Sequence, residues 1–326
     1  LRNAGALIVG KTISTEFAFA EPGPTRNPHD LNYTPGGSSS GSAAAVAAGF
    51  CSLALGTQTI GSVIRPAAFC GIVGFKPTYG RIATMGLIMF SQSVDMVGFF
   101  TQDVPGAALA ASMLCKDWRT LETDPTVKPS TLPVLGVPEG PYLNQASQEG
   151  LEVFEKQLTH LQEAGYTVRR VNVLRDIETI NSRHMRMIFA EMAQVHAAWF
   201  AQYESLYRPR TATAIREGQS VDAEELKLAR NGRMVLRNQL ETAMIEEDID
   251  LWVCPAAPGP APEGITTTGN PIMNLPWTHA GMPVMSLPAG WAANGLPLGL
   301  QVIAPSMADE QLISWTEQLA GVLVEG

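Results

Sequence analysis

The stretch that decides the fold runs from Pro35 to Pro77 and reads PGGSSSGSAAAVAAGFCSLALGTQTIGSVIRPAAFCGIVGFKP. Four serines, at positions 38, 39, 40 and 42, stand between glycines, where the backbone is free to adopt unusual dihedral angles. The alanine run that follows is a strong helix former with little side-chain bulk, so its helix can sit deep in a core. Hydroxyls at the end of a buried helix, with the Gly61-Ser62 turn nearby, indicate nucleophilic chemistry away from bulk water.

The composition of the whole chain is that of a globular protein. The chain has 326 residues, of which 45% are hydrophobic and 16% charged, so it can bury a sizeable core. The net charge is −9, and no basic cluster stands against it. Nucleic acid and an anionic membrane surface are therefore not expected as partners.

The spacing of the cysteines and the length of the apolar runs indicate the cellular compartment of the protein. Cys51, Cys70, Cys115 and Cys254 show no CxxC or CxxH spacing, which favours reduced, buried thiols. The longest run of small apolar residues, 43–55, is too short to span a bilayer. A cytoplasmic location is expected.

Strand-like and helix-like patterns alternate along the chain, which favours one α/β domain. The expected strands are 6–9, 51–55, 71–75, 132–137, 167–173, 251–254, 284–287 and 299–303. The expected helices are 41–49, 105–114, 145–164, 176–207, 221–247 and one from Asp309 onward. The polar segment 116–131 is the best candidate for a surface linker.

These residues resemble the amidase signature family of serine hydrolases. The resemblance rests on 36–39 with the alanine helix, on 61–67, on 71–77, and on SQSVDMVG at 91–98 and GLPLGLQ at 295–301. Ser38 and Ser62 are 24 positions apart, as in the family. The match covers nearly the whole chain and is weakest over 116–250.

The resemblance implies one large α/β domain over 1–326, with a central mixed β-sheet flanked by helices. Its signature core would be 36–77, and the variable, helical region 116–250 would shape the substrate pocket. The N-terminal part of the family's fold is expected to precede Leu1.

The resemblance also assigns roles. It makes Ser62 the nucleophile that forms an acyl-enzyme, and Ser38 the bridging serine that relays its proton, with a cis peptide bond before Ser38. The backbone N–H groups of Thr59, Ile60, Gly61 and Ser62 would form the oxyanion hole. Gly37, Ser39 and Arg65 would lie next to these groups and hold them in position. Neither a cofactor nor a metal is implied.

The sequence departs from the family pattern at several positions. Gln58 stands where Asp is common, Ile60 where Gly is common, and Ile64-Arg65 replaces the frequent order of Arg before an apolar residue. No stretch before Ser38 matches the family's catalytic lysine, and Lys11 matches a structural position instead. The lysine is therefore expected upstream of Leu1, and residues 1–326 alone are expected to be nearly inactive.

The expected activity is hydrolysis of a carboxamide or carbamate C–N bond in a small molecule, and urethane or ester cleavage stays open. Met192, Trp277 and Met285 are candidates for the pocket, with His279 a further one at its border. A homodimer is an open possibility.

Other classes compete with this interpretation. The histidines lack the context of a Ser-His-Asp triad, and no HExxH or other metal-ligand spacing is present. A phosphate-binding module would need the Gly-Lys-Ser/Thr ending that 36–41 lacks. An inactive scaffold and an amidotransferase subunit remain as alternatives.

Overall fold

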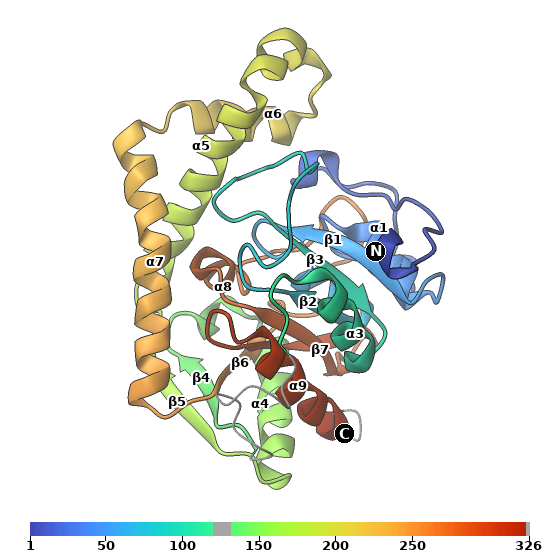
Figure 1. Cartoon of the computed structure of the whole chain (residues 1–326), viewed down its shortest axis with the longest axis vertical. Helices are drawn as coiled ribbons and strands as arrows, with labels where there is room; N and C mark the ends of the chain where they lie inside the picture. The colour runs from blue at the N-terminus through green and yellow to red at the C-terminus, as the bar shows by residue number, and fades with distance from the viewer. Residues whose placement is uncertain (120–131, 324–326) are drawn as a thin grey trace.

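An eight-stranded mixed sheet organises the computed structural model, which describes residues 1–119 and 132–323 (Figure 1). Residues 120–131 of the expected linker lie outside that range. The strand order is β1-β3-β2-β7-β8-β6-β4-β5. The strands are β1 Leu53–Gln58, β2 Val73–Lys76, β3 Met96–Thr101, β4 Leu135–Glu139, β5 Val168–Asn172, β6 Leu251–Pro255, β7 Val284–Trp291 and β8 Pro297–Ile303.

The pairing directions confirm the expected mixed sheet. From β1 through β3, β2, β7 and β8 to β6, each strand pairs antiparallel with the next one in the sheet. The strand β4 pairs parallel with both β6 and β5. Every residue of β8 is buried, as a central strand covered on both faces requires. The turn after β1 and the loops that face it carry the site described below.

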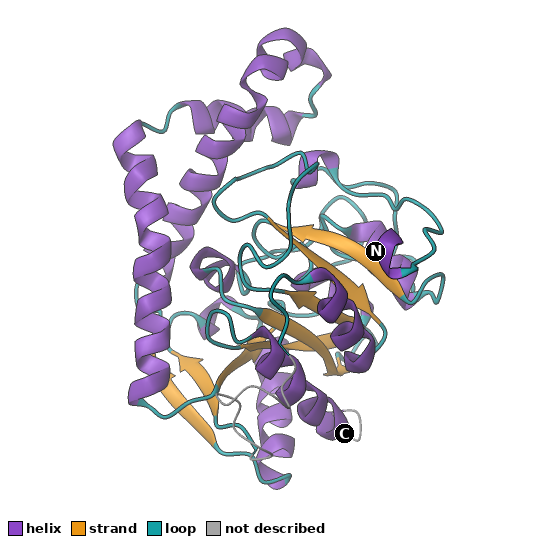
Figure 2. Cartoon of the chain, in the orientation of Figure 1, coloured by secondary structure: helices purple, strands orange, loops and turns teal. Residues whose placement is uncertain are grey.

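Helices surround the sheet (Figure 2). They are α1 Ser40–Ala47, α2 Ile64–Cys70, α3 Val104–Leu114, α4 Gln148–Glu163, α5 Ile177–Tyr203, α6 Pro209–Gln219, α7 Ala223–Glu246, α8 Leu275–Ala280 and α9 Asp309–Leu323. Asp103, Ser147 and Asp222 cap α3, α4 and α7 by accepting a backbone N–H in the first turn. α9 packs against α3 and α4 as well as β7, and α2 packs against β2, β7 and β8.

Helices α5, α6 and α7 form a helical hairpin that stands beside the sheet (Figure 1). Its inner face is apolar and includes Ile188, Met192 and Phe200 of α5 and Leu226 of α7. The helix α8 joins this hairpin to the sheet, because it contacts α5 and α7 and its Thr278 accepts a hydrogen bond from Gln58 of β1. The hairpin therefore belongs to the same folded unit as the signature core.

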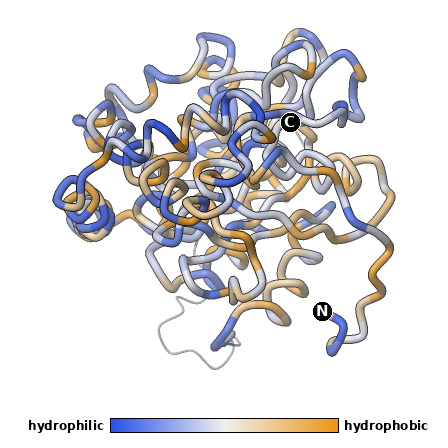
Figure 3. The backbone as a smooth tube through the Cα atoms, turned by 90° about the horizontal axis from the view of Figure 1, so that it is seen from above, coloured by the Kyte–Doolittle hydropathy of each residue, from blue (hydrophilic) through white to orange (hydrophobic). Residues whose placement is uncertain are grey.

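The expected strand at 6–9 is wrong. The chain forms a short 3-10 helix at Arg2–Ala4, and the residues after it are exposed, with Leu7 at 90%. Figure 3 shows this apolar stretch at the edge of the molecule, next to the N terminus. Because it pairs with no described strand, its apolar pattern alone does not make it part of the sheet.

Candidate active site

Ser38 and Ser62 line one pocket, a cavity of about 380 Å³. Ser38 lies in the loop before α1, and Ser62 lies in the turn between β1 and α2. Both residues are buried, with exposed fractions of 3% and 8%. Within the described part of the chain, neither hydroxyl is hydrogen-bonded to the other or to another residue. Two serines whose hydroxyls have no partner in the described part of the chain therefore line one cavity.

The backbone before α1 is fixed by close contacts. The peptide bond between Gly37 and Ser38 is cis, as the resemblance implies. A Cβ on Gly37 would lie 2.7 Å from Cγ2 of Thr268 and 2.9 Å from Oγ of Ser40, so a side chain has no room there. Ser39 both donates to the Thr57 carbonyl and accepts from the Thr57 N–H, at 3.3 and 3.2 Å. These contacts tie the Ser38 loop to β1.

Gln58 shapes the turn that carries Ser62. Its side-chain oxygen accepts the N–H groups of Val63 and Ile64 at 2.7 and 3.0 Å, which closes the turn at the start of α2. Its side-chain nitrogen donates to Oγ1 of Thr278 at 2.9 Å, and that hydroxyl donates to the Ile60 carbonyl at 2.7 Å. An amide therefore serves where the family often has a carboxylate, because it can donate and accept at once.

The turn leaves its own donors free. In residues 1–119 and 132–323, no acceptor bonds to the N–H groups of Thr59, Ile60, Gly61 and Ser62. Buried N–H groups are rarely left without a partner unless a ligand or water takes that place. Thr59, Ile60 and Ser62 line the pocket, whereas Gly61 is not among its lining residues.

Replacing Thr278 by valine is expected to impair this turn at nearly constant side-chain volume. The change leaves the Ile60 carbonyl and the side-chain nitrogen of Gln58 without their partner, which should lower the free energy of unfolding by about 1–3 kcal/mol. If the N–H donors of this turn bind an oxyanion, the change should also lower kcat about tenfold with little change in KM. Steady-state kinetics and urea denaturation check this, with Thr278→Ser as the control that keeps the hydroxyl. An unchanged kcat in a destabilised Thr278→Val protein would contradict the positioning role.

Asp95 holds the same turn from the other side. Its carboxylate accepts the hydroxyl of Thr59 at 2.5 Å and the N–H groups of Phe90 and Ser91 at 2.5 and 2.9 Å. Burial raises the pKa of Asp95 to about 6, although these hydrogen bonds favour the ionised form. Since Phe90 lines the pocket, one carboxylate positions both the turn and part of the pocket wall.

Glu191 connects this region to the helical hairpin. It lies on α5, is 2% exposed, and accepts the hydroxyls of Ser91 and Ser93 at 2.5 Å each. Arg230 of α7 donates to it at 2.6 Å. Burial opposes ionisation of Glu191, but these hydrogen bonds hold its pKa below the usual value. The hairpin is therefore anchored next to the pocket through a buried carboxylate.

Arg65 is the cationic residue of the pocket lining. It is 3% exposed, and its Nη2 donates to the Gly37 carbonyl at 2.5 Å and to Oγ1 of Thr268 at 3.1 Å. Burial lowers the pKa of its guanidinium to about 9. Arg65 therefore supports the cis peptide unit and makes no ion pair among the described residues.

No lysine is among the described residues that line the pocket. Lys11 is exposed, whereas Lys76 of β2 is fully buried. Nζ of Lys76 donates to the carbonyls of Met282 and, at 3.3 Å, Pro77. Burial lowers the pKa of Lys76 to about 7, and Asp309 opposes that shift while Arg237 and Arg233 add to it. Lys76 is thus a buried structural amine outside the pocket.

Replacing Lys76 by methionine is expected to change how stability depends on pH. The pKa of Lys76 lies near 7 in the folded chain and near 10.5 in the unfolded one, so the native state binds fewer protons between these values. The contribution of Lys76 to the free energy of unfolding is therefore complete above the unfolded pKa of 10.5. It is lost as the pH falls through about 7, because the buried amine must then carry a proton. Urea denaturation at about pH 7 and about pH 9 should show a rise for the wild type that is smaller in Lys76→Met. An identical pH dependence in both proteins would refute the shifted pKa.

The histidines play no part in the pocket lining. His184 of α5 and His279 of α8 are buried, and their Nδ1 atoms lie 3.1 Å apart. Burial lowers the pKa values of these two histidines to about 3 and about 2, so the pair is neutral. The idea that His279 borders the pocket is wrong, and a Ser-His-Asp triad has no histidine available at the serines.

The three proposed pocket residues lie in the core instead. Met192 packs inside the helical hairpin, while Trp277 and Met285 belong to the main core, and each is 0% exposed. The indole of Trp277 donates to the hydroxyl of Tyr142 at 2.9 Å. The apolar wall is made by other residues: Phe19, Phe90, Met185, Ile188, Ile272 and Leu275. Helical spacing could not show which apolar side chains face the cavity.

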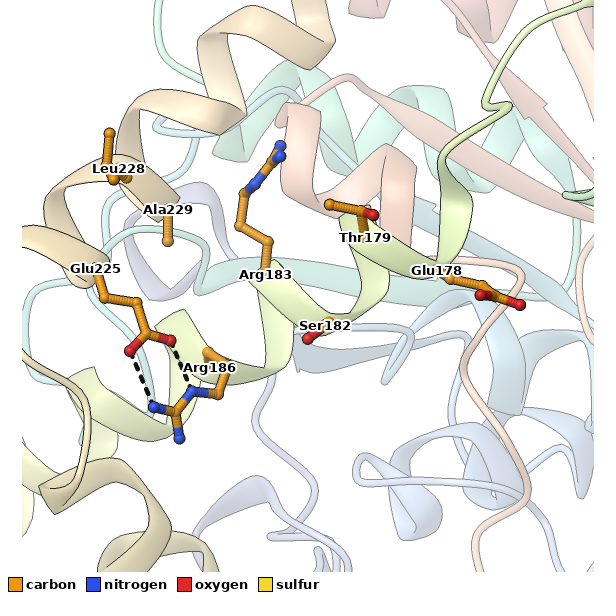
Figure 4. A pocket seen from close by; sticks show the side chains of 8 residues that line it. All are labelled: Glu178, Thr179, Ser182, Arg183, Arg186, Glu225, Leu228 and Ala229. Carbon is orange, nitrogen blue, oxygen red and sulfur yellow. Dashed lines mark hydrogen bonds and ion pairs between the residues drawn. The ribbon is translucent and has the colours of Figure 1, made fainter.

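A second cavity, of about 440 Å³, lies between α5 and α7 (Figure 4). Arg186 and Glu225 form a two-pronged ion pair across it, with Nε and Nη2 at 2.7 and 2.9 Å from the carboxylate oxygens. The pair is partly exposed, and pairs of this kind contribute little to stability. None of its lining residues is shared with the serine pocket.

In the described ranges, no cluster of three or more His, Cys, Asp or Glu side chains is arranged to hold a metal ion. No helix in those ranges combines the length and apolarity needed to cross a membrane. Cys70, Cys115 and Cys254 are buried and free, while Cys51 is free and partly exposed.

Comparison with known proteins agrees with this geometry. The family model described as Amidase matches residues 1–313. A glutamyl-tRNA(Gln) amidotransferase subunit from Symbiobacterium thermophilum is 34% identical over 369 residues, covering 98% of this chain and 74% of that protein. The corresponding subunit of a Cyanothece species is 32% identical over 363 residues, covering 95% and 73%.

Solved structures agree as well. One described as "Crystal structure of amidase" superposes with a TM-score of 0.88 at 30% identity, over 99% of this chain and 76% of that one. The peptide amidase PAM in complex with chymostatin gives a TM-score of 0.80 at 25% identity, over 98% and 75%. The chain belongs to the amidase family, also called the amidase signature family.

Proposed function

We propose that this protein is an amidohydrolase that cleaves a carboxamide or carbamate C–N bond through an acyl-enzyme on Ser62. The observation that carries the proposal is the shared pocket of Ser38 and Ser62, next to a turn with four free N–H donors. Family membership supports the reaction class, because an amidase acts on C–N bonds.

The proposed reaction has two halves. The Ser62 oxygen adds to the carbonyl carbon while its proton passes to Ser38, which hands its own hydroxyl proton on to a lysine base, and the resulting oxyanion accepts the N–H groups of Thr59 to Ser62. Ser38 returns a proton to the leaving nitrogen as the C–N bond breaks, which leaves Ser62 acylated. Water then adds to the acyl carbon, releases the acid and restores the Ser62 hydroxyl. A lysine base belongs to this relay in the family, and none of the described residues that line the pocket is a lysine.

The pocket supports a small substrate with an apolar part. Phe19, Phe90, Ile188 and Leu275 contribute apolar surface to a cavity of about 380 Å³. This volume is within the range of small-molecule sites. Carbamate, urethane and ester substrates would follow the same chemistry, because each presents a carbonyl with a leaving nitrogen or oxygen.

The test uses a fluorophosphonate probe on the full-length gene product. Mass spectrometry of the labelled protein should place the adduct on Ser62, since this reagent captures an activated serine. A panel of primary amides, aryl amides and carbamates then identifies the bond that is cleaved. Failure of the probe to label, together with no turnover of any panel member, would favour the inactive scaffold.

A second candidate is a role as an amidotransferase subunit. Relatives at 30 to 34% identity carry the name of a glutamyl-tRNA(Gln) amidotransferase subunit, which favours this alternative. The two candidates differ in their need for a partner. Turnover of small amides by the purified full-length gene product alone supports the hydrolase, whereas turnover that appears only after co-expression with partner subunits supports the second candidate.

A further inference from the structure

The serine pocket reaches solvent along two stretches of chain. One consists of residues 18–20 and the other of residues 269–272, and both line the cavity without being fully buried. The inner wall differs, because Phe90, Ile188 and Leu275 are at most 2% exposed. Residues that line a cavity and also meet solvent belong to its rim. These two stretches therefore bound the mouth of the pocket.

The first stretch belongs to a strap, residues 16–21, that is held at both ends. Just before it, the N–H of Thr15 donates to the carbonyl of Ser38 at 3.1 Å. At its other end, the carboxylate of Glu21 accepts the backbone N–H of Arg210, in the first turn of α6, at 2.7 Å. Thr15 and Glu21 are buried, at 3% and 7% exposed. The strap thus runs from the catalytic serine loop to the tip of the helical hairpin.

The strap also rests on the hairpin between these two ends. The carboxylate of Glu16 accepts the N–H of Arg208 at 3.2 Å from each oxygen. The ring of Phe17 stacks on that of Tyr207 at 5.4 Å between centroids and meets the His196 ring edge-on at 4.6 Å. Phe17 and the residue after it have φ values of 44° and 60°. Residues with side chains rarely adopt such values, so contacts with the hairpin are needed to keep this conformation.

Arg210 joins the two sides of the mouth. Its Nη1 donates to the carbonyl of Ala20 in the strap at 2.9 Å and to the carbonyl of Thr266 at 3.1 Å. Thr266 lies three residues before the second rim stretch, 269–272. The side chain of Arg210 is exposed and does not line the pocket. Arg210 therefore acts on the pocket through the two segments that it holds together.

We propose that Arg210 is a specificity-determining residue, which holds the strap against the 266–272 loop and so sets an upper limit on the size of the substrate. The inference rests on the proposed function, because the limit applies to molecules that must reach Ser62. Small amides fit the cavity of about 380 Å³ while the mouth is closed. Bulkier ones react only from a state in which the strap has left the loop, so their rate is reduced by the small population of that state.

The experiment measures how fast Ser62 of the full-length gene product is labelled by two fluorophosphonates, one with an ethyl group and one with a cyclohexyl group on phosphorus. The wild type should react faster with the ethyl probe. Arg210→Met should raise the rate constant for the cyclohexyl probe about tenfold, the effect of losing roughly one charge-assisted hydrogen bond, and change that for the ethyl probe by less than about twofold. Arg210→Lys should regain part of the discrimination, because its ammonium group can still donate to the carbonyls.

The matched control is Arg216→Met, which removes an exposed ion pair between α6 and Glu204 and leaves the strap contacts in place. It should keep the wild-type ratio of the two rates. Hydrogen exchange of residues 15–22 should be faster in Arg210→Met than in Arg216→Met, because the strap opens more often.

Two results would overturn this role while leaving the hydrolase intact. One is an unchanged ratio of the two rates in Arg210→Met, with or without faster exchange. The other is an equal acceleration of both probes, which would mean that Arg210 affects the reactivity of Ser62 and not the size of the mouth. Absence of Ser62 labelling by both probes in the wild type would overturn the proposed function and this inference together.

Discussion

Replacing Ser62 by alanine is expected to lower amide turnover by about four to six orders of magnitude, because the change removes the attacking oxygen. The oxyanion donors and the pocket remain, so a small residual rate is expected and substrate should still bind. The change is measured by kcat and KM on the best amide of the panel, and by loss of fluorophosphonate labelling.

The control for this variant is Ser112→Ala, a change to a serine of α3 that does not line the pocket. Ser112→Ala should keep both turnover and labelling. Because Ser62 makes no side-chain hydrogen bond among the described residues, Ser62→Ala should unfold at nearly the wild-type temperature. Substantial turnover by a pure, folded Ser62→Ala protein would rule out this residue as the nucleophile.

Replacing Ser38 by alanine is expected to lower kcat by about a hundredfold to ten thousandfold, the usual range for a group that transfers protons in the transition state. Labelling of Ser62 should become slower but still occur, since the nucleophile is retained. Labelling therefore distinguishes the two serines. Ser62→Ala should form no adduct, whereas Ser38→Ala should form the adduct more slowly.

The double variant sharpens that distinction. If Ser38 acts only through Ser62, Ser38→Ala combined with Ser62→Ala should be no worse than Ser62→Ala alone. Additive losses would mean that Ser38 contributes by a separate route, such as direct contact with substrate. A Ser38→Ala protein with wild-type kcat would contradict the relay.

Patterns in the sequence predicted much of the sheet and its longer helices. The amphipathic spacing of 145–164 and the alternation of elements located α4 and its flanking strands, because each is long enough to show a period. The helices α2 and α8 have seven and six residues, too few for a periodic signal. The stretch at 6–9 has the composition of a strand, but strand formation needs a partner edge that composition does not reveal.

The site was predictable where the resemblance supplied it. The motif spacing placed Ser38 and Ser62 together, and the structure has them in one pocket. Thr278 gave no signal, because it meets Gln58 across 220 positions of sequence. Asp95 lies in a matching motif, yet its bond to Thr59 depends on how the sheet folds.

The substrate pocket could not be derived from periodicity. Met192 and Ile188 lie one helical turn apart on α5, yet Ile188 lines the cavity and Met192 does not. Both are fully buried, so their chemistry and burial are alike. Only the relative placement of α5 and the loops decides which of the two meets a ligand.

The buried carboxylate at position 191 has a consequence for building chimaeras in this family. A designer who exchanges α5–α7 between relatives to alter substrate range moves Glu191 and Arg230 but leaves Ser91 and Ser93 behind. If the residue at position 191 does not match the residues at positions 91 and 93, the graft would leave an unpaired carboxylate, or unpaired hydroxyl donors, in the interior. Exchange of the hairpin should therefore succeed only when these four positions travel as one module.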